Sequence, residues 1–162
     1  MQAIIRDTSD RSEKEKNLIV SEEKYRTLVE NAIEGIFQTT PEGKCITANP
    51  ALARMHGYDS AEDFVTTFSS ADRSLKEIYV NPEDRVRWTR LCDEKGSMGG
   101  FEAQVYRKDK GRIWVIMNAR AVKDEQGTTI RYDGTMVDIT RRKEVEAALK
   151  ASEERYRTFI DS

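Results

Sequence analysis

The two ends of this 162-residue chain repeat each other, whereas the middle does not. Residues 21–31 match residues 152–162 at an offset of 131, and the match extends to residues 3–31 and 134–162. A period this long, with no apolar core of its own at the joints, is typical of an array of similar domains rather than of a solenoid. We therefore expect one complete module within a segment of a longer protein.

The repeat also predicts the boundaries of that module. We expect the tail of a preceding module at residues 1–9, a linker helix at 10–20, the complete module at 21–140, and a helix with the start of a following module at 141–162. Any output activity of the longer protein then lies outside this segment.

The charge of the chain is nearly balanced, with 27 Lys and Arg residues against 29 Asp and Glu residues. Such a chain lacks the basic field that nucleic acid or an anionic membrane surface requires. Its longest apolar runs, about five residues, are far shorter than the ~20 needed to span a bilayer. Cys45 and Cys92 have no metal-type spacing, which is typical of reduced thiols. We expect a cytoplasmic protein without nucleic-acid binding, membrane insertion or a metal site.

The first half of the module combines strand and helix patterns. Residues 35–39 and 44–47 are strand-prone segments on either side of a turn. Asn49 and Asn81 are each followed by Pro, which predicts two helix starts, because Asn caps a helix and Pro suits its first position. Residues 60–80 are expected to mix short helical turns with loop.

The second half of the module consists of strands joined by hairpin turns. The strands are expected at residues 101–106, 113–122 and 128–139. Two strands, a helical block and three hairpin-linked strands predict an antiparallel sheet with helices on one face, which is an α+β domain.

Six segments together resemble the PAS domain with its PAC half. They lie, in the order of that family, at residues 25–37, 49–58, 81–85, 108–115, 124–127 and 134–143. The resemblance implies a PAS fold, a five-stranded antiparallel sheet of order 2-1-5-4-3 with helices on one face, flanked by N- and C-terminal signalling helices. It also implies a bacterial multi-PAS signalling protein, in which such modules precede histidine-kinase or diguanylate-cyclase (GGDEF) domains.

On this resemblance we interpret the segment as a sensory or relay module. Asp138, Ile139 and Thr140 stand where a strand ends and a charged helix begins, and Asp and Thr are good helix-start residues. The resemblance makes this triplet the joint that passes a change in the sheet to a C-terminal coiled-coil helix, and a simple cap is the alternative. The alternative function is a structural dimerisation or spacer module with a filled core. The sequence contains no nucleophile–base pair and no Gly-rich phosphate loop, so we do not expect this segment to be an enzyme.

The resemblance also predicts which side chains face the helices, because alternate residues of a strand face opposite sides of a sheet. These candidates are Leu52, Met55, Tyr58, Val86, Leu91, Phe101, Ala103, Val105, Val115, Met117, Ala119 and Met136. They form either a filled core or the lining of a pocket for a small apolar ligand. Trp114 and Ile116 are expected on the outer face.

The resemblance further allows two cofactors to be tested against the sequence. Blue-light LOV members carry a reactive Cys before the long second helix, and residues 66–80 contain none. Their flavin-binding amides are replaced here by Val105, Val115 and Met136, which cannot form those hydrogen bonds. Haem-binding members use a His of the long helix, and residues 82–96 contain none. Neither LOV-type flavin nor His-ligated haem is expected.

Isolated polar residues of the module are not predicted to form a site. His56 is the only histidine, and we interpret it as structural. Gln38 is expected near the mouth of the pocket and Asn118 on the outer face.

Both flanking helices carry apolar residues at heptad spacing, which favours helix pairing. The candidates are Leu18, Tyr25, Leu28, Val145, Leu149 and Tyr156. We expect a parallel homodimer through residues 10–28 and 141–159, next to neighbouring PAS and output domains in the same chain. Packing of each apolar stripe against its own domain is the alternative.

Overall fold

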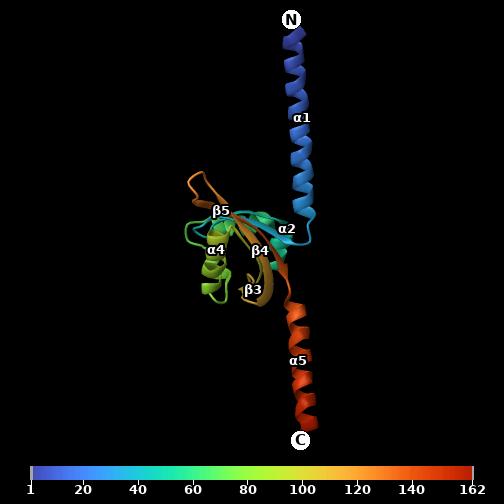
Figure 1. Cartoon of the computed structure of the whole chain (residues 1–162), viewed down its shortest axis with the longest axis vertical. Helices are drawn as coiled ribbons and strands as arrows, with labels where there is room; N and C mark the ends of the chain where they lie inside the picture. Colours follow the sequence, from blue (N-terminus) through green and yellow to red (C-terminus); the bar gives the residue numbers. More distant parts are fainter. Residues whose placement is uncertain (1, 162) are drawn as a thin grey trace.

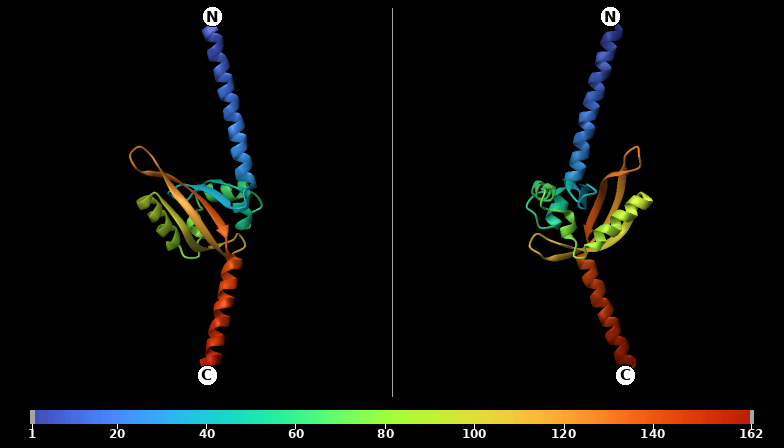
Figure 2. Two further views of the ribbon diagram at one scale, coloured as in Figure 1. Left: turned by 45° about the vertical axis from the view of Figure 1, so that its right-hand side comes forward. Right: turned by 90° about the vertical axis from the view of Figure 1, so that its left-hand side faces the viewer.

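The computed structural model describes the backbone of residues 2–161 and the side chains of residues 11–161. A domain built on a β-sheet lies between two long helices, α1 (Gln2–Asn31) and α5 (Thr140–Asp161). These helices leave the domain in opposite directions (Figure 1), and the two further views in Figure 2 show the same arrangement.

Helix α1 runs without a break through the segments expected as module tail, linker and module start. The division into repeated modules rests on the sequence repeat and stays a prediction. The heptad side chains of both helices are 60–70% exposed in the single chain, which does not fit packing against their own domain; they are Leu18, Tyr25, Leu28, Val145, Leu149 and Tyr156.

The sheet has five strands in the order β2-β1-β5-β4-β3, and every neighbouring pair is antiparallel. The strands are β1 (Gly35–Thr39), β2 (Cys45–Ala48), β3 (Ser97–Tyr106), β4 (Arg112–Lys123) and β5 (Thr129–Asp138). The α+β class and the order 2-1-5-4-3 are therefore confirmed.

The centre of the sheet requires a glycine in β5. A Cβ atom at Gly134 would lie 2.5 Å from the Phe37 ring and 2.7 Å from the backbone oxygen of Asn118. Both distances are too short for van der Waals contact, so any larger residue would displace the Phe37 ring from the core.

Four short helical segments cover the inner face of the sheet. They are α2 (Pro50–Met55), α3 (Ala61–Ser69), the 3-10 helix η1 (Leu75–Ile78) and α4 (Glu83–Lys95). The helix start expected at Asn49 is confirmed, whereas α4 begins one residue later than expected. Asn81 still caps its first turn, because the Asn81 Oδ1 accepts a hydrogen bond from the backbone N–H of Glu83 at 3.1 Å.

Asn49 does more than cap α2. Its Oδ1 accepts hydrogen bonds from the backbone N–H groups of Leu52 and Ile36, at 3.0 and 2.9 Å. Its Nδ2 donates to the carbonyl oxygens of Val29 and Glu34, at 3.0 and 2.9 Å. One buried side chain thus connects the end of α1, the start of β1 and the start of α2.

The alternation of β1 corrects one expectation. Phe37 and Thr39 face the core, so Gln38 lies on the outer face, where it accepts a hydrogen bond from the Thr47 hydroxyl at 3.2 Å. Gln38 is therefore not at the mouth of an inner pocket. Asn118 is exposed on the outer face, as expected.

Candidate functional site

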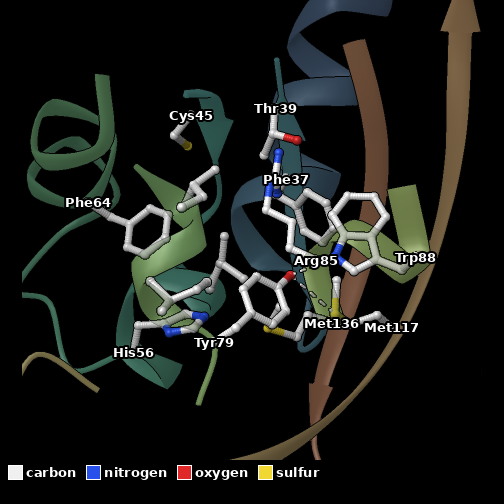
Figure 3. A pocket seen from close by; sticks show the side chains of 13 residues that line it. Phe37, Thr39, Cys45, His56, Phe64, Tyr79, Arg85, Trp88, Met117 and Met136 are labelled. Atoms are coloured by element: carbon white, nitrogen blue, oxygen red, sulfur yellow. Dashed lines mark hydrogen bonds between the residues drawn. The ribbon is translucent and has the colours of Figure 1, made fainter. Parts of the chain in front are cut away.

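A small cavity lies between the inner face of the sheet and the covering helices. Its volume is about 20 Å³, which is room for about one water molecule. Figure 3 shows its lining, which comprises Phe37, Thr39, Cys45, Leu52, His56, Phe64, Leu75, Ile78, Tyr79, Arg85, Trp88, Met117 and Met136.

Eleven of the twelve predicted pocket residues divide into three groups. Leu52, Met117 and Met136 line the cavity. The others on the inner side belong to the surrounding core or pack against it, namely Met55, Tyr58, Phe101, Ala103, Val105, Val115 and Ala119. Leu91 is half-buried on α4. Trp114 and Ile116 are half-buried on the outer face of β4, as the strand alternation predicts.

Val86 does not close the pocket, because 37% of it is exposed to solvent. Helix α4 instead turns Arg85, Trp88 and Cys92 inward, three positions on one helical face. The prediction for Val86 assumed that the aliphatic residue faces the core. The structure shows that the long side chain of Arg85 occupies the inner position.

The lining from α3 and η1 was not predicted from the sequence, because residues 60–80 were expected only to mix short helical turns with loop. Phe64 and Phe68 stand four residues apart on α3 and are both buried. That spacing is the signal that identifies the inner face of this helix. The rings of Phe64 and His56 lie with centroids 5.3 Å apart.

His56 has an unusual environment at one end of the cavity. It is 1% exposed, and its Nδ1 lies 3.3 Å from the backbone oxygen of Tyr106. A carbonyl oxygen can only accept, so Nδ1 carries the hydrogen and Nε2 is a hydrogen-bond acceptor. Nε2 is buried and has no hydrogen-bond partner among the described residues. The interpretation of His56 as structural therefore accounts for Nδ1 but not for Nε2.

Burial lowers the pKa of His56 to about 4. The hydrogen bond to Tyr106 and the charge of Asp138 raise this pKa, and the charge of Arg107 lowers it further, but burial is the largest cause. His56 is therefore neutral at neutral pH, which keeps the lone pair on Nε2.

The middle of the cavity wall is a satisfied chain of polar groups. The Trp88 indole N–H donates to the Tyr79 hydroxyl at 2.9 Å, and that hydroxyl donates to the Met117 sulfur at 3.7 Å (Figure 3). These two hydrogen bonds leave no free donor on the Tyr79 hydroxyl for a molecule in the cavity.

Arg85 and Thr39 lie at the other end. Arg85 is 3% exposed, donates to the carbonyl oxygen of Thr40 at 3.1 Å and lies over the Trp88 ring at 5.2 Å. Within residues 11–161 it forms no ion pair with a carboxylate, and burial lowers its pKa. The Thr39 hydroxyl is buried, and no described residue forms a hydrogen bond with it. In Figure 3, Thr39 and His56 are at opposite ends of the lining.

The second feature is the joint between β5 and α5. The Thr140 Oγ1 accepts a hydrogen bond from the backbone N–H of Trp114 at 3.0 Å and donates one to Asp138 at 2.6 Å. The backbone N–H of Ile139 donates to the carbonyl oxygen of Trp114 at 2.8 Å. The triplet thus forms a cap and also extends the contact with β4. Its role as a joint that passes a change to α5 stays a prediction.

The first turn of α5 is also bound to the outer face of the sheet. Glu102 on β3 forms ion pairs with Arg142 and Lys143, each at 2.7 Å. The ammonium group of Lys143 lies 5.2 Å from the centre of the Trp114 ring. The charges of α5 therefore attach it to the edge strand β3 and to its neighbour β4, at the point where it leaves the domain.

The neutral, buried state of His56 predicts a loss of stability in mild acid. The unfolded chain binds a proton near pH 6.5 and the folded chain only near pH 4, so the free energy of unfolding falls as pH is lowered through this window. We expect a loss of about 2 kcal/mol between pH 7.5 and pH 5, measured by urea denaturation. His56→Leu should lose much less over the same range. Equal losses in both proteins would contradict this assignment.

The comparisons with known proteins agree with this architecture. A model of the PAS domain family matches residues 33–141. Sporulation kinase C of Bacillus subtilis (strain 168) is 32% identical over 154 residues, covering 95% of this chain and 34% of that protein. Sensor histidine kinase TmoS of Ectopseudomonas mendocina is 27% identical over 141 residues, covering 82% of this chain and 13% of that protein. The chain thus spans about a third or less of these two relatives.

Solved structures share the fold at low sequence identity. A sensory box histidine kinase/response regulator from Burkholderia thailandensis E264 has a TM-score of 0.60 at 22% identity, covering 83% of this chain and 98% of that chain. At identities this low, the likeness shows the fold alone. Together with the family match over more than half of the sequence, it shows that the chain belongs to the PAS domain family.

Proposed function

We propose that this PAS domain is a sensory or relay module of a bacterial sensor histidine kinase. A PAS domain is not itself catalytic, and kinase activity would belong to parts of the protein outside this segment. The kinase names of the relatives support this output. A diguanylate cyclase, the other output that the resemblance implies, has no such support from the relatives described above.

The observation that carries the proposal is the direct connection between the cavity and α5. Met117 of β4 and Met136 of β5 line the cavity and are paired in register across the two strands. The next pair on the same side of this ladder is Val115 with Asp138, the first residue of the joint. A change in how the cavity is filled would therefore move the strand ends that hold α5.

A structural spacer with a filled core is the alternative function. The unpaired, buried His56 Nε2 and Thr39 hydroxyl argue against it, because a core that is only structural normally satisfies its polar groups. We accordingly propose that the cavity takes a small ligand. Val105, Val115 and Met136 offer no amide or hydroxyl to a flavin ring, which supports a ligand other than LOV-type flavin.

We also propose a parallel homodimer in the cytoplasm, formed through residues 10–28 and 141–159. The exposed heptad residues of α1 and α5 support it, since helix pairing would bury them. The two helices leave opposite ends of the domain, so both can pair with a second copy along one direction (Figure 2). Among the described helices, none has the length and apolar character to cross a bilayer.

Replacing Thr140 by Val tests the relay. The variant loses the Thr140 hydrogen bonds to Trp114 and Asp138, each worth about 1 kcal/mol, which shifts a two-state equilibrium about fivefold. In the full-length kinase we expect a severalfold change in the rate of autophosphorylation, with the domain still folded at the assay temperature although its melting temperature falls by several degrees. Thr128→Val, at an exposed turn position, is the matched control. An unchanged rate in a folded Thr140→Val protein would contradict the relay.

Replacing Leu149 by Glu tests the dimer. A charge at this heptad position should convert the dimer to monomer at micromolar concentration, as measured by native mass spectrometry. Ala147→Glu introduces the same charge off the heptad seam and should leave the dimer intact. The proposal fails if the unmodified chain is already monomeric at high micromolar concentration.

A further inference from the structure

The cavity contains one acceptor that the fold leaves unused. His56 Nε2 is buried, carries a lone pair and has no hydrogen-bond partner in the part of the chain that the structure describes. The ring is fixed from the other side, because Nδ1 is bonded to Tyr106 and the ring packs on Phe64. An unpaired buried acceptor is unfavourable, and His56 lines the cavity, so this nitrogen calls for a donor there.

The surroundings of Nε2 do not suit a water molecule. A buried water normally forms about three hydrogen bonds. Much of the cavity lining is apolar, including Leu52, Phe64, Leu75 and Ile78, and Phe64 packs on the His56 ring. Tyr79 is already committed to Trp88 and Met117, and Thr39 lies at the far end of the lining (Figure 3). A water at Nε2 would find one acceptor and little else.

A molecule with one hydroxyl and a short apolar body matches these groups better. Its hydroxyl would donate a hydrogen bond to Nε2. Its hydrocarbon part would pack against the carbon atoms of the lining and would need no hydrogen bonds. The cavity of about 20 Å³ is smaller than such a molecule, but its wall contains Met117 and Met136. Methionine is unbranched and flexible, so these two side chains can shift to enlarge the space.

We infer that the cavity binds a small neutral alcohol, whose hydroxyl donates a hydrogen bond to His56 Nε2. This inference rests on the sensory function proposed above and names the chemical class of its ligand. Molecules that only accept hydrogen bonds, such as nitriles, would place their lone pair against the lone pair of His56 Nε2. They should therefore bind poorly next to His56. Carboxylates are rejected for the same reason and also lose their hydration.

The single histidine makes a direct test possible. In protein labelled with ¹⁵N-histidine, the imidazole signals belong to His56 alone, because the chain contains one histidine. The probes are ethanol, which donates a hydrogen bond, and acetonitrile, which has the same number of heavy atoms but only accepts. A molecule of three heavy atoms can bind no tighter than about 1 mM, so both are titrated into the millimolar range and above.

We expect ethanol to shift the Nε2 signal in a saturable way, with acetonitrile binding at least about tenfold more weakly. In His56→Phe the preference for ethanol should disappear, measured by the shifts of the neighbouring backbone amides. The inference is wrong if both probes bind equally, if neither gives a saturable shift, or if Nε2 is already hydrogen-bonded to water and unresponsive. If one of these outcomes is found while Thr140→Val still changes the autophosphorylation rate, the alcohol ligand is wrong and the proposed relay function stands.

Discussion

The four hydrogen bonds of Asn49 are the interaction on which the rest of the structure depends. The side chain is 1% exposed, and its two ends connect the last turn of α1 and residue Glu34 with β1 and α2. Because all four partners are backbone groups, the bonds fix the path of the chain rather than one side-chain contact. Helix α2 in turn places Leu52, and the turn after it places His56, against the cavity.

Thr140 has the corresponding role at the other end of the domain. It joins α5 to β4 by a hydrogen bond from the backbone N–H of Trp114, while Glu102 holds the first turn of α5 by two ion pairs on the outer face. Both long helices are therefore attached to one sheet, and the paired side chains of Met117 and Met136 lie between the cavity and the second attachment. Exposed ion pairs are individually weak, so the buried backbone contacts set the position of α5 and the charges adjust it.

The strands and most turns could be predicted from the sequence, because local chemistry determines them. Asn49 followed by Pro marks a helix start, and the alternation in residues 113–122 marks the inner face of a strand. The strand order came from the family resemblance, since no local pattern encodes which strands pair. Most residues that line the cavity were not predicted either, because their positions depend on contacts between residues far apart in the sequence. His56 meets Tyr106 fifty residues away, and the inward turn of Arg85 depends on a carbonyl group of the β1–β2 turn.

The central claim, that the cavity is coupled to α5, can be tested by amide hydrogen exchange in Met136→Ala. This change enlarges the cavity, and Val105→Ala is a control on the same inner face outside the lining. At matched global stability, we predict faster exchange of the Ile139 and Lys143 amides, which hold the first turn of α5, in Met136→Ala only. Equal exchange of these amides in the two variants would show that the cavity and the helix are independent.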